Sequence, residues 1–515
     1  MNSYLTQGLK RAAQINRNGT ASICEARRRT WSEVRERVAR LAGGLRQLGL
    51  SAGGRVAIMS LNSDRYLELH FAVLWAGGTL LPINMRLAPP EIAYILADGE
   101  PELICADDAG VALLANLAPP LTQPRVHLGD ASAPEGWHSY ERMIEATPAA
   151  DDAERCGHDL AGIFYTGGST GKAKGVMLSH DNLMANAMNA ILLVGFDRTS
   201  VYLHAPPMFH LNDGMSTYAV TMVGGTHVFI PRFEPGACLA AIQQYRVTNV
   251  ALAPTMVTML INHPGVETFD FSAMRQIHFG SSPMPEATLK RAIELWPNLL
   301  LNHGWGMTET SPIGTMLPWE LRLPAVAGER LRSCGHSAPN CEVMVVDEAG
   351  KEVARGAVGE LIIRGPNVMV GYWKKPEETA AALRNGWLYT GDAAVMDEDG
   401  FVYIVDRLKD MIISGGENVY STEVESAISL FPGVAEVAVI GIPDERWGEA
   451  VHAIIVPRPG AGLDVEKIRQ HCRGLIAGYK VPRSIEIRAS PLPLSGSGKV
   501  LKTVLREPFW RGRRL

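Results

Sequence analysis

Tyr165-Thr-Gly-Gly-Ser-Thr-Gly-Lys-Ala-Lys-Gly-Val176 is a segment of small, hydroxyl and lysine residues that follows the apolar pair Ile163 and Phe164. Glycine lets a backbone approach an anion closely, and hydroxyl and lysine side chains add donors and positive charge. The segment therefore has the properties of a loop that holds the phosphates of ATP. The same composition is also typical of a surface turn, so its interpretation depends on the rest of the chain.

The segment differs from the Walker A loop found in many ATP-binding proteins. That pattern needs a glycine five residues before its Gly-Lys pair and a hydroxyl residue directly after it. Thr166 and Ala173 occupy these two positions. The sequence therefore points to a different ATP chemistry.

The length, net charge and cysteine content of the chain limit the kinds of protein that it can be. Its 515 residues are too many for one hydrophobic core and predict at least two domains. A net charge of −5 with dispersed basic residues argues against nucleic acid as the main partner. The seven cysteines show no C-x-x-C pair, which favours buried structural thiols in a reducing cytoplasm over a catalytic thiol.

No segment has the pattern of a membrane or export signal. Residues 1–19 lack the apolar core of a secretory signal, and the apolar run 71–83 is interrupted by Gly77 and Gly78 and is too short for a bilayer. We therefore expect a cytoplasmic protein without an integral membrane segment. Peripheral membrane contact and a homodimer stay open.

Alternating strand-like and helical patterns predict an α/β fold for much of the chain. The expected strands include 55–59, 103–106, 201–205, 250–253 and 275–279, and the expected helices include 32–48 and 285–296.

The pattern changes twice towards the C-terminus. From about residue 341 it becomes hairpin-like, so we expect an N-terminal domain of packed sheets with flanking helices over 1–405, including a β-rich subdomain at about 341–405. The charged strip 406–410 is the expected hinge. Residues 411–515 are expected to form a small, mobile α+β domain with helices at 421–429 and 464–477.

Four further segments carry side chains suited to nucleotide chemistry. The first combines an aromatic ring, a hydroxyl group and a carboxylate, and the second is expected to end a loop with a carboxylate. The third is a charged turn followed by a glycine pair, and the fourth places a lysine on a loop. In that order they are His303-Gly-Trp-Gly-Met-Thr-Glu-Thr310, Trp387-Leu-Tyr-Thr-Gly-Asp392, Asp406-Arg-Leu-Lys-Asp-Met-Ile-Ile-Ser-Gly-Gly-Glu-Asn418 and Pro493-Leu-Ser-Gly-Ser-Gly-Lys499.

The five segments in this order resemble the AMP-forming adenylating enzymes, a superfamily of acyl-CoA and aryl-CoA synthetases, carrier-protein adenylation domains and firefly-type luciferases. The resemblance extends from Thr30-Trp-Ser-Glu-Val34 to Lys499. It implies a large N-terminal domain and a small mobile C-terminal domain. It also implies that the protein uses ATP, Mg²⁺ and coenzyme A to activate a small carboxylic acid.

The resemblance assigns roles at the phosphates. Glu309 is expected to coordinate Mg²⁺, which prefers carboxylate and phosphate oxygens, and Thr308 to contact the α-phosphate. Gly167 stands where Ser or Thr is common and Ala173 where Pro is common, so we expect an altered affinity for ATP. The residues expected to bind the β- and γ-phosphates or to form their loop are Thr166, Gly167, Gly168, Ser169, Thr170, Gly171, Lys172 and Lys174.

The resemblance also assigns the nucleoside site. Trp305 stands where Tyr is usual beside adenine, and its indole offers a larger stacking face. Asp392 is expected to accept both ribose hydroxyls, and Arg407 to hold the nucleotide through its guanidinium group. The remaining residues expected near the adenine are Gly280, Ser281, Ser282, Gly304 and Gly306.

Two half-reactions are implied. Lys499 is expected to bridge the attacking carboxylate and the α-phosphate in the first. Rotation of the small domain at Lys409 is then expected to replace it with a loop that approaches the pantetheine thiol. The residues expected at that thiol are Ser414, Gly415, Gly416 and Glu417, with Trp447 packing along pantetheine.

The acid pocket has fewer assigned residues. His210, within Met208-Phe-His-Leu-Asn-Asp-Gly-Met215, is expected at the carboxylate end of the pocket, with a buried core histidine as the alternative. Methionines could line an adaptable apolar pocket, although a core position is expected for most of them. These are Met208, Met215, Met222, Met256 and Met259.

We therefore predict an AMP-forming acyl-CoA synthetase for a fatty or aryl-substituted acid. The alternatives are an adenylating enzyme that loads a carrier protein, a luciferase-like oxidase, and a non-catalytic nucleotide sensor. A sensor is expected to lack Lys499 or Glu309, and both are present. An amino-acid substrate would need a carboxylate in the pocket segment, where Asp213 is the obvious candidate.

Overall fold

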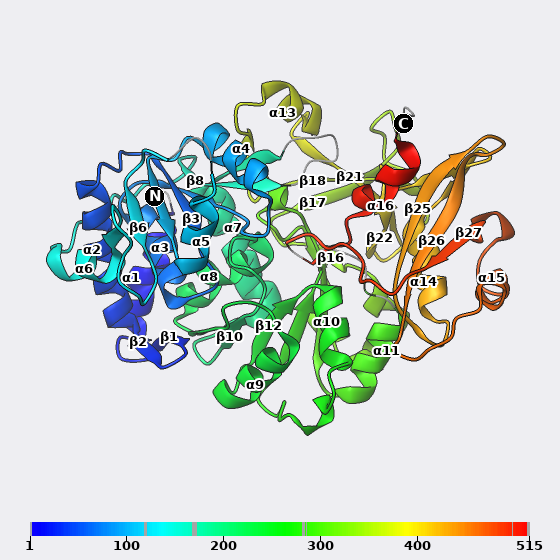
Figure 1. Cartoon of the computed structure of the whole chain (residues 1–515), viewed down its shortest axis with the longest axis horizontal. Helices are drawn as coiled ribbons and strands as arrows, with labels where there is room; N and C mark the ends of the chain where they lie inside the picture. The colour runs from blue at the N-terminus through cyan, green and yellow to red at the C-terminus, as the bar shows by residue number, and fades with distance from the viewer. Residues whose placement is uncertain are drawn as a thin grey trace.

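The computed structural model describes residues 3–117, 121–166, 173–280, 284, 286–496 and 498–511, and the side chains of Met215, Ala325 and Glu329 are also left undescribed. Within these residues the strands form sheets of nine, eight, five and five strands. The molecule is a mixed α/β protein with a large N-terminal domain and a small C-terminal domain, as predicted. Figure 1 shows the N-terminal helices and the C-terminal strands at opposite ends of the molecule.

The eight-stranded sheet has a parallel centre in which β3 pairs with β4 and β5. Its inner strands are continuous apolar runs because both faces of the sheet are covered. Near one edge β8 pairs antiparallel with β9, so the strand before the predicted phosphate loop lies beside the strand after it. In spatial order the strands are β19 (Gly371–Tyr372), β9 (Lys174–Ser179), β8 (Leu160–Thr166), β4 (Thr79–Pro82), β3 (Arg55–Met59), β5 (Leu103–Ala106), β6 (Arg125–His127) and β7 (His138–Ser139).

The nine-stranded sheet is parallel from β1 to β14 and antiparallel at both ends. In spatial order its strands are β16 (His336–Ser337), β15 (Thr315–Met316), β14 (Leu300–Trp305), β13 (Gln276–Phe279), β12 (Asn249–Leu252), β10 (Val201–His204), β11 (Thr226–Phe229), β1 (Thr20–Cys24) and β2 (Arg27–Thr30).

Two helices join the large sheets into one core. Helix α7 (His180–Ala190) packs on β8 and β9, helix α8 (Leu211–Val223) packs on β10 and β11, and the two helices contact each other. The opposite face of the nine-stranded sheet has its own apolar core with α9, α10 and α11. The other helices of this domain are α1 (Thr6–Ile15), α2 (Trp31–Gln47), α3 (Asp64–Trp75), α4 (Pro89–Gly99), α5 (Asp108–Leu114), α6 (Tyr140–Ala146), α9 (Pro235–Tyr245), α10 (Pro254–Ile261), α11 (Glu286–Leu295), α12 (Pro324–Ala327) and α13 (Pro376–Ala382).

A five-stranded antiparallel sheet follows. It contains β17 (Glu342–Val346), β18 (Val358–Arg364), β20 (Leu383–Arg384), β21 (Trp387–Met396) and β22 (Val402–Arg407). The prediction that 387–392 ends a loop is wrong, because this segment is the first half of β21 and pairs with β18 and β22. The expected hinge strip begins in the last two residues of β22. The limits of the domains and of the hinge stay predictions.

The C-terminal domain contains a second five-stranded sheet, visible in orange in Figure 1 beside α14 and α16. The expected helix at 464–477 is shorter, because α15 ends at Arg473 and Gly474 is its C-cap. The elements are β23 (Ile412–Ser414), β24 (Glu417–Val419), β25 (Val434–Asp444), β26 (Gly448–Pro457), β27 (Ser484–Ile487), α14 (Ser421–Ser429), α15 (Val465–Arg473) and α16 (Lys502–Trp510).

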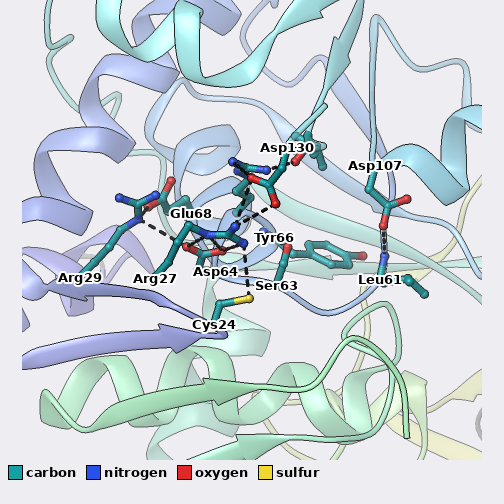
Figure 2. A network of polar contacts seen from close by, with 12 residues as sticks. Cys24, Arg27, Arg29, Leu61, Ser63, Asp64, Tyr66, Glu68, Asp107 and Asp130 are labelled. Carbon is teal, nitrogen blue, oxygen red and sulfur yellow. Dashed lines mark hydrogen bonds and ion pairs between the residues drawn. The ribbon is translucent and has the colours of Figure 1, made fainter. Parts of the chain in front are cut away.

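A buried network of charges joins β2 to α3 (Figure 2). Arg27 Nη2 lies 3.0 Å from Asp64 Oδ1, and Arg29 Nε lies 3.1 Å from Glu68 Oε1. Asp64 and Glu68 are almost completely buried. Because burying an unpaired carboxylate is costly, the arginines of β2 and the acids of α3 depend on each other.

Candidate functional site

A cavity of about 1110 Å³ lies between the two domains, where the carboxyl ends of β13 and β14 face β21, β22 and the turn before α16. In Figure 1 this turn runs from the C-terminal domain into the middle of the molecule. Residues from seven separate parts of the chain meet at the cavity. The predicted site residues in its wall are Thr166, His210, Gly280, Gly304, Trp305, Gly306, Thr308, Glu309, Asp392, Arg407, Lys409 and Lys499.

Lys499 ends a tight turn inside the cavity. The Ser495 amide donates to the Lys499 carbonyl (2.7 Å), and the Lys499 amide donates to Ser495 Oγ (3.0 Å). Burial lowers the pKa of the Lys499 ammonium group to about 8, and the charge of Arg407 adds to this shift, whereas Asp392 and Glu309 oppose it. The side chain is therefore a cation near neutral pH that is partly removed from water.

Asp392 is buried and fixed by two donors. Trp305 Nε1 donates to its Oδ2 (2.7 Å), and Arg407 Nε contacts its Oδ1 (2.6 Å). Each carboxylate oxygen can accept a second hydrogen bond. The carboxylate is thus held in one orientation and retains capacity for two further donors, such as a pair of vicinal hydroxyls.

Glu309 stands in the short helix η3 (Thr308–Thr310) and is 7% exposed. Tyr372 donates its hydroxyl proton to Glu309 Oε1 (2.9 Å). Lys174 lies outside the cavity wall, with its Nζ 5.1 Å from the centre of the Tyr372 ring. Burial and the neighbouring Glu309 raise the pKa of Tyr372, which keeps the phenol protonated as a donor.

His210 is the N-cap residue of α8, and its Nδ1 accepts a hydrogen bond from the Asn212 amide (3.1 Å). Because Nδ1 is an acceptor, the neutral ring carries its proton on Nε2. Burial lowers the pKa of His210 to about 3, and Lys499 adds to this shift. His210 is therefore a neutral hydrogen-bond donor at the cavity and not a base.

Backbone packing requires glycine at two positions beside the cavity. A Cβ on Gly280 would lie 2.5 Å from the Gly304 carbonyl oxygen, and one on Gly306 would lie 1.5 Å from the Pro312 carbonyl oxygen. Gly280 lets the chain after β13 pack closely on β14, and Gly306 lets the segment after β14 fold back on Pro312.

The residues predicted at the thiol form a second group outside this cavity wall. The Gly415 amide donates to the Trp447 carbonyl (2.8 Å), and a Cβ on Gly415 would lie 2.6 Å from the Trp447 ring. Ser414 is buried beside this turn, whereas Glu417 is exposed. The structure therefore places Lys499 in the cavity and the turn 414–417 away from it.

Comparison with known proteins gives the family. Residues 9–373 match the family described as AMP-binding enzyme, and residues 423–499 match the AMP-binding enzyme C-terminal domain. The chain belongs to the AMP-binding enzyme family. The first match alone covers more than half of its length.

Relatives of this AMP-binding enzyme include CoA ligases. A feruloyl-CoA synthase from Amycolatopsis sp is 38% identical over 97% of this chain and 98% of that protein. An indoleacetate–CoA ligase from Aromatoleum aromaticum is 35% identical over 98% of both chains. The prediction of an AMP-forming acid–CoA ligase is confirmed at this level.

The solved structures are similar over the whole chain. ATP-bound MatB from Rhodopseudomonas palustris is 32% identical, with a TM-score of 0.89 over 100% of both chains. The apo form of the same protein gives 0.77 over 99% of both chains. The arrangement of this AMP-binding enzyme is thus more similar to the ATP-bound form than to the apo form.

Several predictions for this AMP-binding enzyme lie outside the described residues. They concern the central phosphate-loop residues Gly167, Gly168, Ser169, Thr170, Gly171 and Lys172, and the adenine-site residues Ser281 and Ser282. Thr166 and Lys174, at the two ends of the loop, are paired with each other as the last and first residues of β8 and β9. Among the methionines, Met259 lines the cavity, whereas Met208 and Met256 are buried in the core.

The structure argues against an amino-acid substrate bound by Asp213 and against a catalytic cysteine. Asp213 is fully buried and is held by His204 Nδ1 (2.6 Å) and the Tyr202 hydroxyl (3.1 Å), so it is not placed to bind a substrate ammonium group. Cys334 is the cysteine in the cavity wall, and burial raises the pKa of its thiol to about 12. A neutral thiol is a poor nucleophile, which argues against a catalytic cysteine at this site.

Sequence reasoning missed Tyr372, Arg86 and Thr255. Tyr372 contacts Glu309, and the other two contact the turn that carries Lys499. Each contact joins segments more than 60 residues apart, and no local pattern marks these residues.

Within the described ranges, no helix combines the length and apolar composition needed to cross a bilayer.

Proposed function

We propose that this AMP-binding enzyme converts an aryl-substituted carboxylic acid into its CoA thioester through an acyl-adenylate. The observation that carries the proposal is the meeting of Lys499, Glu309, Asp392 and Arg407 at one cavity. This set matches the charges of the reaction, with acceptors for the ribose and cations for the phosphate and carboxylate oxygens.

The first step joins the acid to AMP. A carboxylate oxygen of the acid attacks the α-phosphorus of ATP, the bond to the β-phosphate oxygen breaks, and pyrophosphate leaves. Lys499 neutralises negative charge that develops between the carboxylate and the α-phosphate. Asp392 accepts the ribose hydroxyls, and Trp305 and Arg407 hold Asp392 in place. His210 donates Nε2–H toward the carboxylate end of the acid.

Glu309 fits a Mg²⁺ ion that arrives with ATP. Its Oε1 is occupied by Tyr372, and in the described part of the chain no hydrogen bond reaches Oε2. Mg²⁺ binds few carboxylates and keeps substrate phosphate and water oxygens as its other ligands. When bound, the ion would neutralise charge on the departing pyrophosphate.

The second step transfers the acyl group to CoA. The thiol sulfur attacks the acyl carbon, the bond to AMP breaks, and the thiol proton passes to solvent. The turn 414–417 lies outside the cavity that holds Lys499. We infer that the C-terminal domain rotates between the steps, withdrawing Lys499 and bringing this turn and Trp447 to the thiol.

An aryl acid is favoured by the wall of the cavity. Phe279 and His303 stack at 4.8 Å in this wall, and the pair offers planar surfaces to an aryl ring. His278 and Asn302 are buried polar side chains in the same wall. The feruloyl-CoA and indoleacetate ligases among the relatives act, by name, on aryl acids.

A pyrophosphate-release screen tests this proposal. Aryl acids (3-phenylpropenoate, its 4-hydroxy derivative, indoleacetate) and fatty acids of 8 to 16 carbons would be compared with and without CoA. We expect the highest kcat/KM with an aryl acid, and acyl-CoA only when CoA is present. Preference for a long fatty acid would contradict the acid assignment, and pyrophosphate release without any CoA thioester would contradict the acceptor.

Lys499→Ala separates the two steps. We expect pyrophosphate release to fall at least about 100-fold, as for the loss of other transition-state donors. Conversion of a supplied acyl-adenylate to the thioester should stay within about twofold of wild type, since Lys499 leaves the site before that step. Wild-type pyrophosphate release by the variant would show that Lys499 has another role.

A further inference from the structure

The turn that carries Lys499 is held by the N-terminal domain from two sides. Arg86 Nη1 donates to the carbonyl oxygen of Gly496 (3.0 Å), and Thr255 Oγ1 donates to the carbonyl oxygen of Gly498 (2.9 Å). The two donors are therefore bound to carbonyls three and one residues before Lys499. Both acceptors belong to the C-terminal domain, and both donors to the N-terminal domain.

Arg86 approaches from the segment after β4 in the eight-stranded sheet. Its own amide donates to Asn84 Oδ1 (2.9 Å), which fixes a local turn. Asn84 also lies against the turn, because a Cβ on Gly496 would come within 2.4 Å of its Nδ2. Arg86 is exposed as a residue, and its bond to Gly496 is partly buried.

Thr255 approaches from the opposite side, in the first turn of α10 behind the nine-stranded sheet. Gly498 has a φ of +84°, and a Cβ there would lie 3.0 Å from Thr255 Oγ1. Glycine thus lets the carbonyl of residue 498 reach the threonine hydroxyl. Both bonds use backbone carbonyls, and the Lys499 ammonium group lies close enough to Arg407, Asp392 and Glu309 for their charges to shift its pKa.

We propose that Arg86 and Thr255 are positioning residues that hold the Lys499 turn in the cavity for acid activation and release it for the thiol step. The inference rests on the proposed function, since it needs two half-reactions and a moving C-terminal domain. Within the turn, Ser495 and Lys499 are bonded to each other and move together. The bonds from Arg86 and Thr255 therefore act on the whole turn and are broken when it leaves.

The proposal predicts a selective loss of the first step. Each substitution removes one hydrogen bond, so Arg86→Ala and Thr255→Val should each slow pyrophosphate release about 2- to 13-fold. The double variant should lose more than either single one, and Thr255→Ser should recover the rate because it restores the hydroxyl. Conversion of a supplied acyl-adenylate should be unchanged or faster, since the turn leaves more easily.

The experiment uses the full chain with ATP and 3-phenylpropenoate, or octanoate if wild type is active only with that acid, and the matching synthetic acyl-adenylate for the second step. ATP binding, measured by calorimetry, should stay within about twofold, because neither residue is assigned to the nucleotide. Arg46→Ala is the matched control. Arg46 also donates to carbonyls, those of Trp75 and Ala76 (3.1 and 3.2 Å), but within one domain.

The outcomes separate the two proposals. Wild type that forms no acyl-adenylate with any acid of the screen would overturn the proposed function and the inference that rests on it. Active wild type with both steps slowed equally in the variants, or with Arg46→Ala reproducing the selective loss, would overturn the positioning role alone. Selective loss of the first step with recovery in Thr255→Ser would support it.

Discussion

The local environment of Lys499 determines the pH dependence that we expect for the first step. The pKa of its ammonium group is lowered to about 8, so the group is charged below this pH and becomes neutral above it. The kinetic parameter kcat/KM for ATP reports the pKa values of groups in the free enzyme. If the charge on Lys499 stabilises the transition state, kcat/KM for pyrophosphate release should be constant near pH 7. Above about pH 8 it should fall by up to about tenfold per pH unit.

Lys499→Arg provides the control for this pH prediction. A guanidinium group stays charged throughout the range, so the variant, although slower, should lose the decline above pH 8. Stopped-flow measurements of pyrophosphate release between pH 6.5 and 9.5 would check both proteins. A wild-type profile that stays flat to pH 9.5 would show that the proton on Lys499 is not required.

Helix α3 carries two buried carboxylates, Asp64 and Glu68, that are paired with arginines. Asp64 accepts from Arg27 and lies 3.5 Å from Arg29, and it is 1% exposed. Asp64→Ala leaves Arg27 and Arg29 without this partner, so we expect a loss of about 3 kcal/mol in the stability of the N-terminal domain. Glu36→Ala removes an exposed i, i+4 partner of Arg40 and should change the stability little.

Urea unfolding followed by far-UV circular dichroism would check this prediction, with the transition of the N-terminal domain analysed separately because a two-domain chain need not unfold in one step. Equal midpoints for Asp64→Ala and Glu36→Ala would mean that the buried network contributes no net stability.

Elements with a strong local pattern could be predicted from the sequence. The strands 55–59 and 103–106 and the helix 421–429 have the expected limits, since short apolar runs and a helical pattern are local properties. Strand β21 was missed because its apolar positions are explained only by pairing with β18 and β22. Tertiary pairing is not visible in a single sequence.

The site residues also divide into those that a sequence motif predicts and those that only tertiary contacts explain. Lys499, Glu309 and Asp392 were assigned through the resemblance of whole motifs, and the structure places them at one cavity. The bond between Trp305 and Asp392 and the one between Arg86 and Gly496 join residues 87 and 410 positions apart. Such contacts depend on how the sheets and domains pack, so no spacing in the sequence could predict them.

At the scale of the whole molecule, the turn 414–417 provides a test of domain rotation. Gly416 has a φ of +84°, and a Cβ there would meet no atom within 4 Å. Gly416→Leu therefore adds a side chain to open space in this structure, and the first step should change less than about twofold. If rotation brings the turn to the thiol, the same side chain should block it and slow conversion of a supplied acyl-adenylate at least about tenfold.

Gly460→Leu is a matched control for this last prediction. Gly460 lies in the same domain, has a φ of +78° and also has no atom within 4 Å of a built Cβ, so both substitutions strain the backbone in the same way. Single-turnover measurements of the two steps in both variants would separate strain from obstruction. Because the strain is shared, a deficit confined to Gly416→Leu and to the thiol step would assign the effect to the position of the turn. Equal deficits in the two variants, or equal losses in the two steps, would argue against a rotation that delivers residues 414–417 to CoA.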